Sequence, residues 1–200
     1  MARISLSPPR TLFHRAIEWY SKRSYGAVLE PAKALGHHPR VLWTDLRLEQ
    51  SVAKWDKLDP TLKALAVMAS AASIGCSWCM DFGYWENTRH GVPAEKLHHV
   101  PLWRDSDVYA PLERDVMEYA EAMTATPPTA TDALTERLCE QLGEAAFVEL
   151  TAMIAVENLR SRMNSALGLT SQGFKDSCEV PPAAARKAAD APAGASAESR

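Results

Sequence analysis

The stretch Gly75-Cys76-Ser77-Trp78-Cys79-Met80-Asp81-Phe82-Gly83 places two cysteines three positions apart, directly after a glycine that separates two predicted helices. Residues three apart lie on the same side of one helical turn, so the two thiols can face each other. A dithiol with this spacing can close to a disulfide and open again. Thiol–disulfide redox chemistry is therefore the leading hypothesis for the function of this chain.

Turn and cap signals around this stretch predict an all-helical fold. Asp59-Pro60 reads as a helix cap followed by the first helical residue, and Leu62, Leu65, Ala66 and Ala69 follow at helical spacing. The other predicted helices are 12–25, 39–56, 76–90, 93–99, one from Pro111 until Pro127-Pro128, one capped by Thr131-Asp132 and ending at Leu142, and 144–167. In the last helix, an apolar ladder is formed by Val148, Ala152, Ala155, Leu159 and Met163.

Length and composition predict one domain with a tail. The chain has 200 residues, of which 46% are hydrophobic, enough for one compact core. Beyond Val180 it contains no large apolar residue. We expect a single helical domain over residues 1–175 and a disordered tail over 176–200.

The net charge and the distribution of apolar residues limit which partners and which cellular compartment we expect. A net charge of −3 gives no reason to expect a nucleic-acid partner. No run of eighteen apolar residues indicates a membrane span, and the amino end has no apolar signal-peptide core. We therefore expect a cytoplasmic protein. Because the cytoplasm keeps most thiols reduced, we do not expect its cysteines to form a framework of structural disulfides.

The cysteine pair has three interpretations. A zinc site needs two more ligands, but Cys139 and Cys178 are far apart in the sequence and His98-His99 are adjacent, so we expect neither a metal nor another cofactor. Two inert buried cysteines remain a second interpretation. In the redox interpretation, one thiolate attacks a peroxide and the other cysteine condenses with the resulting sulfenic acid. Because a helix amino end lowers a thiol pKa, helix position favours Cys76 as the attacking residue.

Four segments, in their order along the chain, resemble the carboxymuconolactone decarboxylase and alkylhydroperoxidase D-like family over about residues 30–170. They are Leu58-Asp59-Pro60 to Leu65-Ala66, Cys76-Ser77-Trp78-Cys79-Met80-Asp81, Gly91-Val92-Pro93-Ala94-Glu95-Lys96-Leu97, and the run from Asn158 to Leu169. The resemblance implies an all-α bundle that assembles into dimers, trimers or hexamers. It also implies a hydroperoxide reductase in which Cys79 meets the peroxide, Cys76 resolves it, and an external dithiol reduces the pair.

The chain departs from this family at the proton relay. The hydroperoxidase pattern has a glutamate twelve residues before the first cysteine and a histidine four after the second; these positions hold Ala64 and Gly83. Neither residue can transfer a proton. Asp81, Glu86 and His90 are the nearby candidates for a rebuilt relay, and we expect slow turnover of small hydroperoxides.

Two further functions remain open. The other branch of the family decarboxylates a lactone without a cofactor, for which Arg160 and Arg162 would supply charge and His90 a proton. Alternatively, the chain is a non-enzymatic helical oligomer with an inert or regulatory cysteine pair. Trp78 and Trp85 share a helix face, where we favour helix packing or a subunit interface over a pocket for an organic peroxide.

Overall fold

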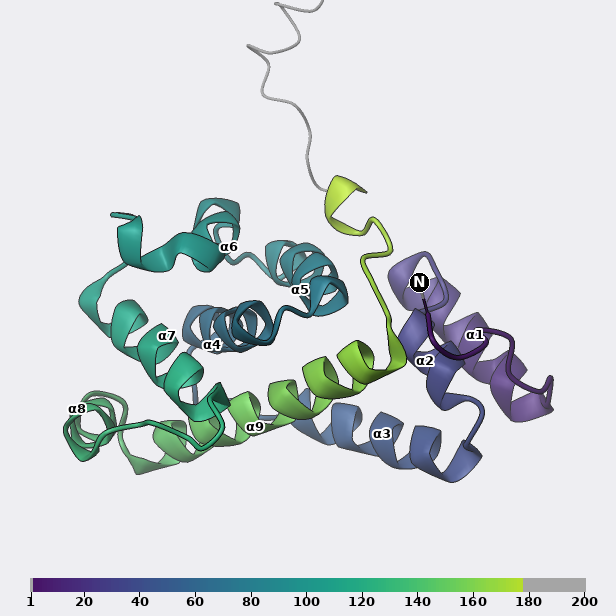
Figure 1. Ribbon diagram of the computed structural model, residues 1–200, viewed down its shortest axis with the longest axis horizontal. Helices are drawn as coiled ribbons and strands as arrows, with labels where there is room; N and C mark the ends of the chain where they lie inside the picture. Colours follow the sequence, from purple (N-terminus) through teal and green to yellow (C-terminus); the bar gives the residue numbers. More distant parts are fainter. Residues whose placement is uncertain (1, 178–200) are drawn as a thin grey trace, which may run out of the picture.

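The computed structural model describes residues 2–177, in which every regular element is a helix (Figure 1). The all-helical fold predicted from the sequence is thereby confirmed. The elements are α1 Leu12–Tyr25, α2 Glu30–Leu35, α3 Pro39–Val52, α4 Pro60–Ile74, α5 Ser77–Arg89, α6 Ala94–His99, η1 Val100–Asp105, α7 Pro111–Thr124, α8 Asp132–Leu142, α9 Glu144–Leu167 and η2 Lys175–Ser177, where η marks a 3-10 helix.

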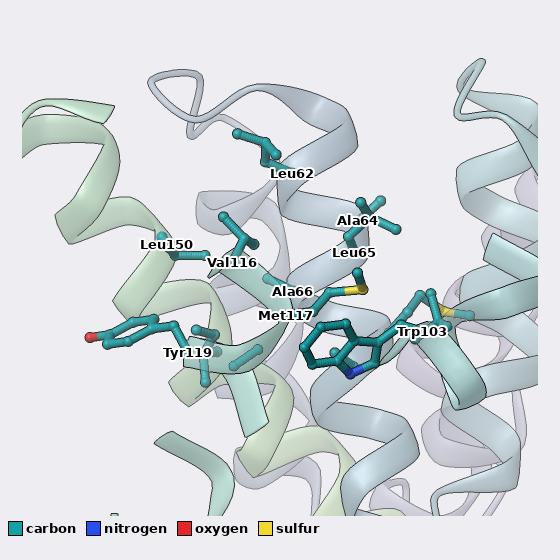
Figure 2. Close-up of a cluster of buried hydrophobic side chains, with 14 of the residues drawn as sticks. Leu62, Ala64, Leu65, Ala66, Trp103, Val116, Met117, Tyr119 and Leu150 are labelled. Atoms are coloured by element: carbon teal, nitrogen blue, oxygen red, sulfur yellow. The ribbon is translucent and has the colours of Figure 1, made fainter. Parts of the chain in front are cut away.

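Helix α4 is the centre of the bundle and packs against α5, α7 and α9. Leu65 and Ala66 of α4, Val116 of α7 and Leu150 of α9 belong to one cluster of buried side chains, which Figure 2 shows in close-up. A helix that is apolar on most of its faces must be covered on all of them. The buried residues of α4 are Leu62, Ala64, Leu65, Ala66, Met68, Ala69, Ser70 and Ala71.

The start of α4 follows the predicted cap. The Oδ1 atom of Asp59 accepts hydrogen bonds from the backbone N–H groups of Thr61 at 2.8 Å and Leu62 at 3.2 Å. Pro60 follows as the first helical residue, where its missing N–H loses no helical hydrogen bond. The cap fixes where α4 begins and so fixes the register of the helix that leads to the cysteines.

The apolar ladder predicted in α9 is not the buried face of that helix. Val148 and Leu159 are large exposed hydrophobic residues, and Leu159 keeps 44% of its surface. The buried side instead combines apolar and polar residues: Ala146, Glu149, Leu150, Met153, Ile154, Val156, Glu157, Ser161 and Asn164. The ladder was misleading because the inward face of α9 carries polar groups that find partners inside the protein.

Some boundaries also differ from the sequence prediction. Helix α3 ends at Val52 rather than at residue 56, because the chain turns there and the N–H of Lys57 binds a carboxylate oxygen of Glu149 at 2.7 Å. The short helix α2 and the 3-10 helix η1 were not predicted, since six residues are too few for a clear apolar period.

The last described element, η2, crosses the boundary at residue 175 that was predicted between domain and tail, since it spans Lys175–Ser177. The rest of the predicted tail, 178–200 with Cys178, lies outside the described residues. Within residues 2–177, no helix has the combined length and hydropathy of a bilayer span.

Two leucines on α9 test which face of this helix is buried. Leu150 has no exposed surface, so Leu150→Ala should lower the free energy of unfolding by about 2–5 kcal/mol. The matched substitution Leu159→Ala, on the exposed ladder, should change it by about 0.5 kcal/mol or less. Urea denaturation followed by circular dichroism at low protein concentration measures both, and equal losses would contradict this assignment of faces.

Candidate functional site: a buried cysteine pair at the start of α5

The cysteine pair is positioned by the turn between α4 and α5. Gly75 ends α4 with φ +79°, a left-handed conformation that glycine adopts without steric cost. The N–H groups of Gly75 and Cys76 each donate to the carbonyl oxygen of Ala71 at 3.0 Å, which closes the helix end. The chain reverses here, so that Cys76 becomes the N-cap residue of α5.

The two sulfur atoms face each other across the first turn of α5. Cys76 and Cys79 are joined as a disulfide with their Cα atoms 5.3 Å apart, and the N–H of Cys79 donates to the Cys76 sulfur at 3.2 Å. Both residues are buried, with 2% of Cys76 and 7% of Cys79 exposed. The pair packs in a small cluster with Ala71 and Trp78, against which Leu29 also lies.

Helix α9 directs two hydrogen-bond donors at one of these sulfur atoms. The Ser161 hydroxyl lies 3.3 Å and the Asn164 side-chain amide 3.4 Å from Cys79 Sγ. Both donors are buried. Hydrogen-bond donors stabilise negative charge on the atom that accepts them, so these two side chains can stabilise negative charge that develops on the Cys79 sulfur.

A buried carboxyl group lies directly behind Ser161. Glu157 Oε1 is 2.6 Å from the Ser161 hydroxyl oxygen, and only 2% of Glu157 is exposed. Burial raises the pKa of Glu157 to about 7, against the opposing effects of Arg160 and Ser161. The group can therefore hold or release a proton near neutral pH.

Arg160 joins Glu157 to helix α3. Its guanidinium binds both carboxylate oxygens of Glu49 on α3, with Nε 2.7 Å from Oε1, and lies 3.4 Å from Glu157. Asp45 belongs to the same cluster: burial and the charge of Glu49 raise its pKa to about 6, although Arg160 opposes the shift. One arginine faces three carboxyl groups, so the cluster retains a proton more readily than isolated carboxylates would.

The two positions at which the resemblance places a relay are packed without polar groups. Ala64 is 3% exposed within the apolar core shown in Figure 2. At Gly83, even a Cβ atom would lie 2.6 Å from the Met68 sulfur. A histidine side chain at this position would have to displace the Met68 side chain, which fills the space beside Gly83.

Asp81 has a different task from the proton relay expected of it. Its carboxylate accepts hydrogen bonds from the backbone N–H groups of Gln172 at 2.8 Å, Phe174 at 3.1 Å and Lys175 at 2.7 Å. Burial alone would raise the pKa of Asp81, but these donors and the Ser171 side chain outweigh it and hold the pKa below its ordinary value. Asp81 therefore acts as a charged acceptor that fastens residues 172–175 to α5.

Glu86 and His90, the other expected relay residues, lie away from the sulfur atoms. At about 1.5 Å per residue, Glu86 is roughly 10 Å and His90 roughly 16 Å from Cys79 along α5. His90 is the exposed C-cap residue, and its Nδ1 lies 3.0 Å from the Glu86 carbonyl oxygen. The structure does not bring either residue to the cysteine pair.

The two tryptophans of α5 pack against the C-terminal segment. Trp78 stacks on Phe82 with ring centroids 5.0 Å apart, and its indole N–H donates to Gln172 at 2.8 Å. Trp85 lies against Phe174, with centroids 5.3 Å apart. Residues 172–174 thus cover α5, and the packing role favoured from the sequence agrees with these contacts.

The groups expected of a lactone decarboxylase are not brought together. Arg160 is engaged by Glu49 and Glu157, whereas Arg162 donates to the carbonyl oxygen of Thr124 at 3.0 Å. His90 lies at the far end of α5. A shared anion pocket of these three side chains is therefore absent from the described structure.

Sequence reasoning missed Glu157, Ser161 and Asn164 as site residues. They follow one another at spacings of four and three, which places them on one helix face. The available signal was that these polar residues continue, at helical spacing, an apolar face that contains Met153. Such a pattern indicates polar side chains that point into the protein. Among residues 2–177, no group of three or more His, Cys, Asp or Glu side chains has an arrangement suited to a metal ion.

The chain matches a known protein family and a bacterial relative in sequence. The model of the carboxymuconolactone decarboxylase family matches residues 39–122. The uncharacterized protein YnjA of Escherichia coli K12 is 34% identical over 171 residues, which span 85% of this chain and 92% of YnjA.

Two solved structures share the fold at low sequence identity. A peroxidase-related protein from Ralstonia eutropha JMP134, with an alkylhydroperoxidase AhpD core, has a TM-score of 0.74 at 18% identity, covering 90% of this chain and 98% of its own. The debrominase Bmp8 also has a TM-score of 0.74, at 19% identity, covering 86% and 94%.

The fastening role of Asp81 predicts a loss of stability in Asp81→Asn. An amide keeps one acceptor oxygen but loses the charge, so the free energy of unfolding at neutral pH should fall by about 1–3 kcal/mol. Asp132→Asn, at the exposed start of α8, serves as control and should change it by about 0.5 kcal/mol or less.

The same pair of proteins gives a pH test. Because folding lowers the pKa of Asp81, its stabilising effect is complete above the unfolded-state pKa of about 3.9 and disappears as pH falls through the folded-state value. The stability difference between wild type and Asp81→Asn should therefore shrink in acid. A difference that stayed constant or grew in acid would refute the role of the charged carboxylate.

Proposed function

This chain belongs to the carboxymuconolactone decarboxylase family, and we propose that it is an oxidoreductase whose Cys76 and Cys79 cycle between dithiol and disulfide while reducing small hydroperoxides. One observation carries the proposal: the two sulfurs are in bonding contact, and a second helix aims the Ser161 and Asn164 donors at the sulfur of Cys79. A pair that served only as apolar filling would have no need of such donors.

The proposed reaction begins at Cys79. Its thiolate attacks the terminal oxygen of the hydroperoxide, the O–O bond breaks, and the departing alkoxide takes up a proton to leave as an alcohol. Cys79 is then a sulfenic acid. The thiolate of Cys76 attacks the Cys79 sulfur, an S–S bond forms, and hydroxide leaves and is protonated to water.

An external dithiol completes the cycle. It supplies two electrons and two protons, becomes a disulfide itself, and returns Cys76 and Cys79 to thiols. Such a reductant is maintained in a reducing compartment, so we place the reaction in the cytoplasm.

Cys79 is assigned as the attacking residue for two physical reasons. The side-chain donors of α9 act on its sulfur, and it is the more exposed of the two cysteines. Cys76, at the N-cap, benefits from the helix dipole and accepts the Cys79 N–H, which suits a resolving thiolate. The family resemblance implies the same division of roles.

Burial of the pair limits the substrate. With Cys79 only 7% exposed and Trp78 packed beside it, a small hydroperoxide reaches the sulfur more easily than a bulky one. We therefore expect slow turnover that decreases further as the hydroperoxide becomes larger.

We also propose that the chain works as a homo-oligomer, a dimer, trimer or hexamer as the resemblance implies. Large exposed hydrophobic side chains, among them Trp19 on α1, Trp43 on α3 and Leu159 on α9, fit contacts between copies. The alternative of an inert cysteine pair in a non-enzymatic assembly is decided by the following measurement.

Consumption of hydrogen peroxide and of a bulkier organic hydroperoxide, with dithiothreitol as reductant, tests the proposal. Wild type should turn over both, the smaller one faster, and Cys79→Ser should fall to the uncatalysed rate because the attacking sulfur is lost. Cys76→Ser should be oxidised at Cys79 without forming the internal disulfide. The control Cys139→Ser changes a cysteine of α8 outside the pair and should behave as wild type. A wild-type rate equal to that of Cys79→Ser would end the proposal.

A further inference from the structure

The Ser161 hydroxyl lies between a sulfur and a carboxyl group. Its oxygen is 3.3 Å from Cys79 Sγ and 2.6 Å from Glu157 Oε1, and all three residues are buried. A hydroxyl has one hydrogen to donate, although it can also accept. Once the pair is reduced and Cys79 carries a thiol or thiolate, Ser161 can donate to one of these neighbours and accept from the other.

Two arrangements of protons satisfy this geometry in the reduced protein. In the first, the Cys79 thiol donates to Ser161, and Ser161 donates to the ionised carboxylate of Glu157. In the second, the carboxylic acid of Glu157 donates to Ser161, and Ser161 donates to the thiolate of Cys79. Moving one hydrogen along each bond converts the first into the second, so that a proton passes from sulfur to carboxylate without any change in total charge.

We propose that Ser161 and Glu157 form the proton relay of Cys79, replacing the relay positions that Ala64 and Gly83 occupy; this inference rests on the redox function proposed above. Glu157 takes the thiol proton through Ser161 before the attack on the hydroperoxide. The same path returns the proton to the alkoxide as the O–O bond breaks. The thiol and hydroperoxide are converted to sulfenic acid and alcohol, with the proton conserved.

The surrounding charges keep Glu157 able to exchange a proton. Burial raises its pKa to about 7, and Glu49 adds to this effect, while Arg160 and Ser161 oppose it. Arg160 is shared, because its guanidinium also binds Glu49, whose charge in turn contributes to the raised pKa of Asp45. Near neutral pH, Glu157 is therefore held neither permanently as a carboxylate paired with Arg160 nor permanently as a protonated acid.

The contact distances favour a relay over a purely structural ion pair. Glu157 lies 2.6 Å from the Ser161 hydroxyl but 3.4 Å from the nearest guanidinium nitrogen of Arg160. A carboxylate placed only to bind Arg160 would not need the shorter contact toward the cysteine. Asn164 completes the site as a donor to Cys79 that carries no transferable charge.

Infrared difference spectra between the reduced and the oxidised protein provide the test. About one pH unit above the Glu157 pKa of about 7, this group is mostly ionised beside the disulfide but gains the Cys79 proton when the pair is reduced. Reduction should therefore produce a carboxylic-acid C=O band in wild type. The band should be absent in Glu157→Gln. Glu149→Gln, at another buried glutamate of α9 that is paired with Lys63, should retain it.

Variants at Ser161 separate a relay from a nearby charge. Ser161→Thr keeps the hydroxyl and should keep the band, whereas Ser161→Ala removes the path and should lose or weaken it. In peroxide consumption, Glu157→Gln and Ser161→Ala should each lower the rate by about 100-fold or more. Glu157→Gln should also abolish the pH dependence due to Glu157, whereas a merely structural role would leave the shape of the pH profile unchanged.

The infrared spectra test the proton relay and peroxide consumption tests the redox function, so either hypothesis can be refuted without the other. A carboxylic-acid band that does not respond to the redox state of wild type would overturn the relay, whether or not the variants fold. If hydroperoxide is consumed without that band, the redox function stands and the relay is wrong. If the band appears in a protein that consumes no hydroperoxide, the relay stands and the proposed substrate is wrong.

Discussion

The contact between Cys79 on α5 and the polar face of α9 is the constraint on which the site depends. Buried polar groups must be hydrogen-bonded, and three of them, Glu157, Ser161 and Asn164, point inward from α9. Ser161 contacts both Glu157 and the Cys79 sulfur, Asn164 donates to the same sulfur, and Arg160 forms an ion pair with Glu157. The same contacts that make a polar stripe tolerable inside a helical bundle thus create a polar environment for one sulfur of a buried dithiol.

The rest of the fold holds α5 where this contact is made. Gly75 reverses the chain after α4 and makes Cys76 an N-cap, which sets the direction of the first turn of α5. Met68 fills the space beside Gly83, so that α4 and α5 pack closely. Asp81 fastens residues 172–175, which follow α9, onto the first turns of α5. Packing in the core, a glycine turn and a buried carboxylate therefore all support one geometry at the sulfur atoms.

Features that depend on neighbours in the sequence were predictable. The Asp59-Pro60 cap, the break at Gly75 and the helical turn that carries both cysteines follow from local rules and agree with the structure. The partners of Cys79 did not follow from such rules, because Ser161 lies 82 positions away and its role depends on how α9 packs against α5. The apolar ladder through Leu159 was misleading for a related reason, since a period shows a face without showing which way it points. Asp81 was expected at the site because it is near in sequence, whereas its carboxylate is taken up by residues 172–175.

The central claim is that these two sulfurs form a working redox couple, and intact-mass and peptide mass spectrometry test it most directly. The fully reduced chain is treated with one equivalent of hydrogen peroxide, digested, and compared with a sample then treated with dithiothreitol. A working couple should lose two hydrogen atoms from the mass of the chain, show a linkage between Cys76 and Cys79, and be fully reversed by the dithiol. A chain in which both cysteines remain unlinked and unmodified while Cys139 is oxidised would contradict it.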